Sequence, residues 1–192
     1  MPTIVTHAAV PLALGLGLGH KRIPGRLLVI GIAASMLPDI DVLSFRFGIP
    51  AGDILSHRGL THSLFFAAMT AVYVAYSSRM LKVNAWVAGL FAFVCIASHP
   101  LLDMLTTGGS GVALLWPWSD ERMFFPYQVI QVSPFNISAF FSQRGVNVIV
   151  SELAWVWFPC VLIMMALAWP RLNRQKRQLE RIRNSQRGPT QE

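Results

Sequence analysis

The stretch Val146–Trp169 reads VNVIVSELAWVWFPCVLIMMALAW, and residues 170–187 directly after it read PRLNRQKRQLERIRNSQR. A transmembrane helix needs about 20 consecutive apolar residues, so the first stretch is long enough to cross a bilayer. The second contains seven of the sixteen Lys and Arg residues of the chain. An apolar run that ends in a basic segment is typical of a membrane helix whose positive end remains in the cytoplasm. We therefore expect an integral membrane protein.

The composition of the whole chain points in the same direction. Of its 192 residues, 54% are hydrophobic and only 13% are charged, whereas a soluble domain usually carries about 25% charged residues. The hydrophobic residues also occur in long runs, as in helices that face lipid. We predict an all-α membrane protein, a bundle of about five transmembrane helices with a polar metal site at one membrane face. The expected membrane segments are Ile4–Gly19, Arg26–Pro38, His62–Arg79, Asn84–Leu105 and Val146–Trp169.

Further expectations concern boundaries and cysteines. The segment Arg26–Pro38 is too short to cross a bilayer at full thickness, so we expect it to tilt or to end inside protein. Residues 1–169 are predicted to form one membrane-embedded domain, and residues 170–192 a basic, disordered cytoplasmic tail. Cys95 and Cys160 both lie in apolar segments, which predicts packing rather than a disulfide framework.

Following the predicted helices back and forth sorts the basic residues into two groups. Twelve of the sixteen Lys and Arg residues fall on one side, in the loop 20–26, at Arg79 and Lys82, and in the tail. Because cytoplasmic loops are enriched in Lys and Arg, we predict that this side is cytoplasmic and that the opposite side, with the N-terminus, is periplasmic. We interpret the basic tail as a cytoplasmic juxtamembrane segment, and we expect no nucleic-acid partner. The four basic residues on the opposite side are Arg46, Arg58, Arg122 and Arg144.

Histidine and aspartate residues converge on the side with few basic residues. Four of the five histidines and four of the five aspartates fall at the helix ends that face it. Ionisable residues in a membrane are energetically costly and usually functional, so this convergence predicts a functional site. The eight residues are His7, His57, His62, His99, Asp39, Asp41, Asp53 and Asp103.

Two short motifs within this set have the spacing of metal ligands. In the stretch HPLLD, Asp103 lies four positions after His99, so on a helix the two residues share one face, within reach of one cation. The alternative is a hydrogen bond that caps the helix end. In the stretch PDID, Asp39 and Asp41 follow Pro38, which suits a loop that wraps a cation. Here the alternative is a solvated aspartate turn.

The densest polar cluster is the stretch HRGLTHS, residues 57–63. Either His57 or His62 is a candidate metal ligand, and Arg58 is a candidate for holding an anionic oxygen. The alternative is a capping loop with bystander histidines. His7, just inside the first apolar segment, is a further candidate ligand, with polar packing as its alternative.

Together these residues predict a metal site. Imidazole and carboxylate donors without thiolate suit zinc or another borderline divalent ion, so we expect one or two zinc ions, with manganese or iron as alternatives. Glu152 is an acid within an apolar stretch and needs a partner. It could be a metal ligand, a general base or the ion-pair partner of an arginine. The candidate ligands are His7, Asp39, Asp41, His57, His62, His99 and Asp103.

Five stretches taken together resemble a known family. They occur in matching order over about residues 3–160 and read THAAV, PDID, HRGLTHS, SHPLLDMLTTGG and LLWPW, at residues 6–10, 38–41, 57–63, 98–109 and 114–118. This series resembles the YdjM-type family of bacterial inner-membrane, metal-dependent hydrolases, also described as LexA-binding. The resemblance implies a multi-pass protein of the inner membrane with hydrolase activity.

That family is in turn distantly similar to zinc-dependent phospholipase C and the fungal single-strand nucleases. By this resemblance, His99 and Asp103 match a metal-binding HxxxD pair, and either Asp39 or Asp41 matches a bridging aspartate. His7 and His62 match the single histidine ligands. The chain departs from the pattern because His99 is its last histidine, which leaves no later pair to hold a third zinc ion.

The leading hypothesis is a metal-dependent hydrolase of phosphoesters in lipid or lipid-linked substrates. Metal-activated water would attack phosphorus, with Asp41 or Glu152 as base and Arg58 or Arg122 holding phosphate. Trp116 and Trp118 would lie among the lipid headgroups. A non-catalytic, metal-stabilised scaffold or partner-binding protein is the alternative, and a transporter fits less well because the polar residues cluster at one face. The sequence leaves the oligomeric state open.

Overall fold

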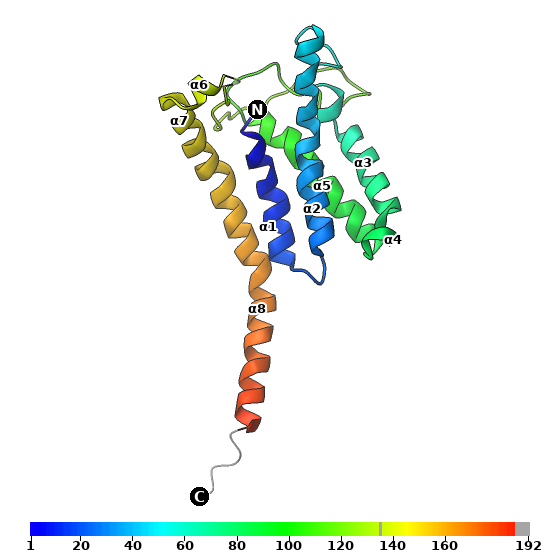
Figure 1. The fold of residues 1–192 in the computed structure, drawn as a ribbon, viewed down its shortest axis with the longest axis vertical. Coiled ribbons are helices and arrows are strands. Elements are labelled where there is room, and N and C mark those ends of the chain that lie inside the picture. The colour runs from blue at the N-terminus through cyan, green and yellow to red at the C-terminus, as the bar shows by residue number, and fades with distance from the viewer. Residues whose placement is uncertain (135, 187–192) are drawn as a thin grey trace, which may run out of the picture.

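The computed structural model describes residues 1–134 and 136–186, and this part of the chain is all-helical (Figure 1). It contains no β-strand within the described residues, only two isolated β-bridges, Thr106 with Ile130 and Val112 with Met123. Both bridges lie within residues 105–136, a long connection between helices where the sequence carries several Gly and Pro residues. The expected all-helical class is therefore confirmed.

The first two helices form an antiparallel pair. A 3-10 helix, η1 (Ile4–Ala8), leads into α1 (Ala9–Leu18), which ends where Gly19 adopts a φ of 80°. After a basic loop, α2 (Gly25–Met36) returns and continues as a 3-10 helix, η2 (Leu37–Phe47).

The prediction that the second apolar segment ends at Pro38 is wrong. Gly25–Phe47 forms one helical run of 23 residues, long enough to cross a membrane. Pro38 is tolerated because it occupies the first turn of η2, where a backbone N–H is not required. As a result, Asp39 and Asp41 lie on a helix rather than in a loop that wraps a cation.

The middle of the chain forms a second antiparallel pair. The short η3 (Leu60–His62) precedes α3 (Leu64–Tyr76), and Ser63 caps α3 by accepting a hydrogen bond from the N–H of Phe66. A single turn, α4 (Ser78–Leu81), leads to α5 (Ala85–Met104).

The last part of the chain is nearly continuous helix. It consists of α6 (Ile137–Phe140), α7 (Gln143–Glu152), a π-helical turn η4 (Leu153–Trp157) and α8 (Phe158–Gln186). In the structure α8 continues through the basic segment to Gln186, within residues 170–192 that the sequence predicts to be a disordered cytoplasmic tail. Its Arg, Lys, Gln and Leu residues are good helix formers. Residues 187–192, which include Arg187, lie outside the described residues.

Three helical runs are long and apolar enough to cross a membrane: Gly25–Phe47, Ala85–Met104 and Gln143–Asn184. The other two predicted segments correspond to shorter apolar helical runs, Ile4–Leu18 and Leu64–Tyr76. The structure thus supports a membrane-embedded helical bundle with three candidate full-length spans and shorter apolar helices, and the expected five transmembrane helices are not confirmed.

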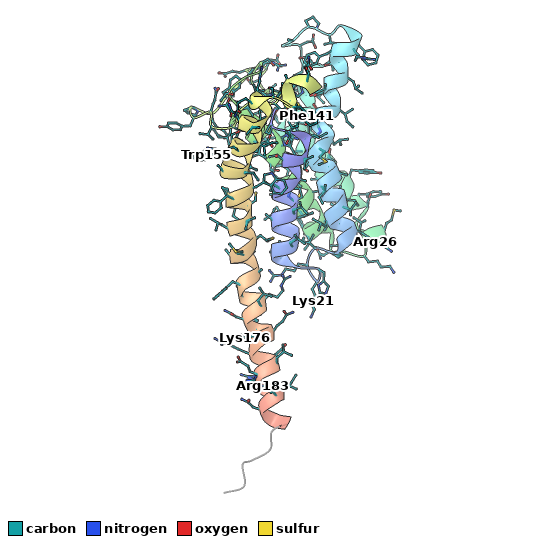
Figure 2. All side chains as sticks on the ribbon, turned by 60° about the vertical axis from the view of Figure 1, so that its left-hand side comes forward. Lys21, Arg26, Phe141, Trp155, Lys176 and Arg183 are labelled. Carbon is teal, nitrogen blue, oxygen red and sulfur yellow. The ribbon has the colours of Figure 1, made fainter. Side chains whose placement is uncertain are left out.

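The helices alternate in direction, as the sequence predicts. The α1–α2 loop, α4 and the C-terminal part of α8 lie toward one end of the molecule, and η1, the end of α5 and α6 lie toward the other (Figure 1). Lys21, Arg26, Lys176 and Arg183 accordingly lie away from Phe141 and Trp155 (Figure 2). We call these the basic end and the histidine end.

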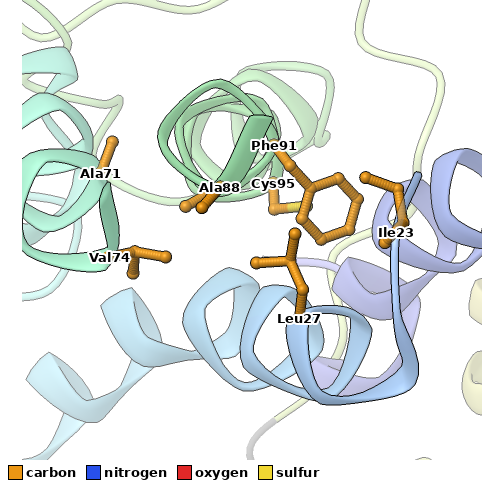
Figure 3. Packing of buried hydrophobic residues seen from close by; sticks show 8 residues of the cluster. Ile23, Leu27, Ala71, Val74, Ala88, Phe91 and Cys95 are labelled. Atoms are coloured by element: carbon orange, nitrogen blue, oxygen red, sulfur yellow. The ribbon is translucent and has the colours of Figure 1, made fainter. Parts of the chain in front are cut away.

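The apolar core between α2, α3 and α5 is built on small residues (Figure 3). Leu27 of α2 and Phe91 of α5 are buried in it beside Ala71 and Ala88. A Cβ built on Gly31 would lie 2.4 Å from the Phe91 ring, so a larger residue there would push α2 and α5 apart. Small residues at such contacts allow membrane helices to pack closely, and this packing brings the histidine ends of α2 and α5 together.

Candidate metal centre

Five side chains from four elements converge at the histidine end. His7 comes from η1, Asp39 from η2, His62 from η3, and His99 and Asp103 from α5. The three histidines and Asp103 have no exposed surface, and Asp39 is 6% exposed. We call these five residues the His/Asp centre.

The donor atoms fall into two groups: the ligand atoms of His7, His99 and Asp103 lie within 4.8 Å of one another, and so do those of Asp39, His57 and His62. His62 Nε2 is 3.0 Å from His99 Nε2, and His99 Nε2 is 3.4 Å from Asp39 Oδ1. His7 Nε2 is 3.8 Å from Asp39 Oδ2 and 3.7 Å from Asp103 Oδ1. With metal–donor distances of about 2.1 Å, neighbouring donors of one ion lie roughly 3.0 Å apart in octahedral and roughly 3.4 Å apart in tetrahedral geometry.

Several polar atoms of the centre have no hydrogen-bond partner within the described chain. They are both ring nitrogens of His7, both carboxylate oxygens of Asp39, and Oδ1 of Asp103. A buried polar atom without a partner costs about 1–3 kcal/mol, and more if it is charged. A divalent cation would satisfy the inward-facing donors at once, so the residues present fit a metal ion.

The rings of His62 and His99 are oriented so that the same nitrogen faces inward. Nδ1 of His62 lies 3.0 Å from Asp41 Oδ2, and Nδ1 of His99 lies 2.7 Å from the carbonyl oxygen of Ser35. Because each Nδ1 faces an acceptor, each neutral ring carries its proton there and presents a lone pair at Nε2. Two lone pairs 3.0 Å apart repel each other unless a cation or a proton lies between them.

The environment of His62 favours the form of histidine that binds metals. Burial lowers the pKa of His62 below its usual value, although the hydrogen bond to Asp41 acts in the opposite direction. Desolvation disfavours the charged imidazolium, so burial keeps the ring neutral. Neutral imidazole is the ligand form.

Asp41 lies one layer outside the centre and organises it. Its carboxylate accepts a hydrogen bond from Thr61 Oγ1 at 2.6 Å and one from the N–H of Arg58 at 3.1 Å. It also lies 2.7 Å from Nδ1 of His57 and 3.0 Å from Nδ1 of His62. A carboxylate that holds the outer nitrogen of a histidine is the usual second layer of a metal site. The ligand atoms of both histidines of HRGLTHS lie within 4.8 Å of that of Asp39, so His57 and His62 both lie at the centre.

Arg58 is a buried partner of the centre rather than a free cation. Its Nε donates to Asp103 Oδ2 at 2.8 Å, Nη2 donates to Thr106 Oγ1 at 2.8 Å, and Nη1 donates to the carbonyl oxygen of Gly108. A Cβ on Gly109, which has a φ of 107°, would lie 2.3 Å from Arg58 Nη1. The glycine therefore makes room for the guanidinium. Because every nitrogen of the guanidinium already has an acceptor, Arg58 is poorly suited to hold phosphate.

The residues expected to bind substrate lie farther out. Arg122 holds loops together, donating to the carbonyl oxygen of Asp53 at 2.7 Å and to that of Gly111 at 3.4 Å. The rings of Trp116 and Trp118 both make edge contacts with Phe65. Trp118 is 79% exposed, as a headgroup contact would require.

Glu152 forms a separate buried cluster. Its carboxylate accepts hydrogen bonds from the N–H and Oγ1 of Thr3 and from Oγ1 of Thr6. Trp157 Nε1 also donates to Thr6 Oγ1. We call Glu152, Thr3, Thr6 and Trp157 the Glu152 clasp. It ties α7 and η4 to η1, and Thr6 directly precedes His7, so the clasp fixes the element that carries that histidine.

Three residues that contact these clusters were not anticipated from the sequence: Ser35, Thr3 and Thr6. The carbonyl of Ser35 is a backbone group, which leaves no signal in the sequence. Thr3 and Thr6 are polar residues at the start of an apolar segment and form a weak signal, but nothing in the sequence pairs them with an acid 146 to 149 residues away.

Comparisons with known proteins agree on the relationships of the chain. Residues 1–176 match the YdjM inner membrane protein family. Inner membrane protein YbcI of Escherichia coli (strain K12) is 53% identical over 175 residues, which is 89% of this chain and 99% of that protein. No solved structure matches the chain.

Proposed function

The chain belongs to the YdjM inner membrane protein family, and we propose that it is a membrane-bound, metal-dependent hydrolase of phosphoesters in lipid or lipid-linked substrates. The observation that carries the proposal is the His/Asp centre, in which five buried donors converge and several lack any hydrogen-bond partner within the described chain. Such a centre at one end of a membrane-embedded helical bundle suits an enzyme that acts on lipid.

His7, Asp39, His62, His99 and Asp103 would hold one divalent ion. Three imidazoles and two carboxylates suit zinc, and manganese or iron would also accept them. When bound, such an ion supplies Lewis-acid activation of water and of a phosphoryl oxygen. Arg58 balances the charge of Asp103 through its Nε donor, and the carbonyl of Ser35 and the carboxylate of Asp41 orient two of the imidazoles.

His57 is the residue we assign to proton transfer. Its Nδ1 lies 2.7 Å from Asp41 Oδ1, the arrangement in which a carboxylate orients a histidine that acts as base. A ligand atom of His57 lies within 4.8 Å of those of Asp39 and His62, so the ring is next to the centre. Asp41 therefore acts as a positioning residue, and Glu152, whose carboxylate already accepts three hydrogen bonds, holds η1 in place.

The proposal is tested by hydrolysis assays on purified, metal-replete protein with a panel of phospholipids and small phosphoesters. We expect His57→Gln to keep its metal and to lose activity by about 100-fold or more, the usual contribution of a general base. His20→Gln, an exposed histidine at the basic end, is the matched control and should behave as wild type. Absence of hydrolysis by metal-loaded wild-type protein over the whole panel would refute the enzyme assignment.

The distribution of basic residues supports a periplasmic centre and a cytoplasmic C-terminus. A reporter that is active only in the cytoplasm, fused after residue 192, should therefore be active. An inactive but intact fusion would reverse the orientation and leave the geometry of the centre unaffected.

One observation favours a non-catalytic role as the second candidate. Four of the five donor side chains are fully buried, and closed coordination is characteristic of structural metal sites. In that case the ion would only join η1, η2, η3 and α5, and the protein would act as a scaffold. X-ray absorption spectroscopy of the loaded protein separates the two roles, because a structural site has only protein donors whereas a catalytic site retains an exchangeable water.

A further inference from the structure

A cavity of about 740 Å³ opens beside the His/Asp centre. Its wall includes Phe45 of η2, His57, Arg58, Val132, Pro134 and Arg144 of α7. His57 links the cavity to the centre, because one of its ligand atoms lies within 4.8 Å of those of Asp39 and His62. A molecule bound in the cavity would therefore abut the residues assigned above to hydrolysis.

The charges on the cavity wall have one sign. The described lining residues include two arginines and no Asp or Glu. The guanidinium of Arg58 already donates to Asp103, Thr106 and Gly108, one hydrogen bond from each nitrogen. Arg144 is different: its side chain is exposed, and it makes no hydrogen bond or ion pair with the described part of the protein. Its backbone N–H does bond to Ser142, which fixes the start of α7.

Part of the remaining wall is apolar, beside the polar residues Ser110, Ser133 and Asn136. Phe45, Val132, Pro134 and Ala139 line the cavity. Phe47 and Phe141 each lie two positions after a lining residue in the chain, and they are 80% and 84% exposed. Phe141 lies at the histidine end, near the start of α7 (Figure 2). Exposed aromatic residues suit the membrane–water interface, which favours a ligand that resides in the membrane.

We propose that Arg144 is a substrate-binding residue that holds the phosphate group of an amphiphile, with the alkyl part of the amphiphile against the apolar wall. This inference rests on the proposed function and narrows its substrate class to anionic phospholipids and other alkyl phosphoesters. Arginine suits this role because its planar guanidinium binds phosphate through two parallel hydrogen bonds. A cavity of this volume is within the range of small-ligand sites.

The test uses hexylphosphonate, which carries the alkyl and phosphate features but has a C–P bond that hydrolysis does not cleave. Its binding is measured by calorimetry to the full chain in nanodiscs of zwitterionic lipid, with protein-free nanodiscs as the blank. The variants are Arg144→Gln, Arg144→Lys and, as the matched control, Arg174→Gln on the exposed basic part of α8. Inorganic phosphate and hexanol are titrated in parallel.

We expect wild type and R174Q to bind hexylphosphonate equally, R144Q to bind it about 10-fold more weakly, and R144K to be intermediate, because lysine keeps the charge but loses the paired donors. Binding that is unchanged in R144Q, or absent in wild type, would overturn the inference. Inorganic phosphate that binds as tightly as hexylphosphonate would also overturn it, because the alkyl part would then contribute nothing. These outcomes are independent of the hydrolase assignment, since the probe is not hydrolysed and the metal content of R144Q should equal that of wild type.

Discussion

Two buried polar clusters lie at the same end of the helical bundle, and they differ in whether their polar atoms have partners. In the Glu152 clasp, three donors meet one carboxylate and the Trp157 indole adds a fourth hydrogen bond at Thr6. In the His/Asp centre, both oxygens of Asp39 and both ring nitrogens of His7 have no such partner within the described residues.

This difference separates structure from chemistry. A buried carboxylate with all its hydrogen bonds made is complete as it stands and joins elements of the fold. A group of buried donors and acceptors that face one another without bonds requires an additional species, and a cation fits the donor set here. Burial and charge alone would have put the two clusters in the same category.

The largest expected effect tests the centre itself. Asp39→Asn keeps the shape of the side chain but removes a negative charge whose oxygens have no other partner. We expect its affinity for zinc, measured by competition with a chromophoric chelator, to fall by more than about 100-fold, beyond the range expected for a residue outside the first layer of ligands. Asp120→Asn, an exposed aspartate, is the control. An Asp39→Asn variant with wild-type affinity would remove Asp39 from the centre.

An intermediate effect on metal affinity is expected for Asp41, which contacts His62 rather than the ion. Asp41→Asn weakens the hold on Nδ1 of His62, which lies 3.0 Å from the carboxylate, while leaving all five donors in place. Replacing such an outer partner lowers metal affinity by about 10- to 100-fold, and the same titration measures it. If the loss equals that of Asp39→Asn, Asp41 is itself a ligand; if there is none, the orientation of His62 does not depend on it.

The smallest expected effect on metal binding belongs to the clasp. Glu152→Gln leaves hydrogen bonds of Thr3 and Thr6 incompletely satisfied, so we expect the free energy of unfolding to fall by about 1–3 kcal/mol, measured by thermal denaturation in detergent. The ion content should stay at the wild-type level. Glu180→Gln on the exposed part of α8 is the control for loss of charge. A Glu152→Gln protein that is stable but metal-free would show that the Glu152 clasp is part of the metal site.

The sequence predicted the bundle better than its boundaries. Long apolar runs and basic loops are local signals, so the positions and directions of the helical segments followed from them. The continuation of α2 through Pro38 did not follow, because a proline at the first turn of a 3-10 helix and one at a helix end look the same in sequence. The continuation of α8 into the basic segment was not anticipated, because charge suggested disorder more strongly than the helix propensity of its residues suggested a helix.

In the candidate site, too, local sequence patterns predicted some features and left others open. The spacing of His99 and Asp103 predicts that they share a helix face, and both side chains do lie in the centre. The choice between His57 and His62 as ligand stays open, because both belong to one short segment and both lie close to Asp39. It depends on the turn at Arg58, whose φ is 69°, and on contacts with η2. The partners of Glu152 come from the other end of the chain, where no local pattern points to them.

The most direct test of the account is elemental analysis of detergent-purified protein, comparing wild type with His62→Ala/His99→Ala and with Glu152→Gln. We predict about one zinc, manganese or iron ion per chain in wild type and in Glu152→Gln, and none in the double variant. Well-folded wild-type protein that contains no metal even after reloading would contradict the account. The His/Asp centre would then be a hydrogen-bonded polar cluster like the Glu152 clasp.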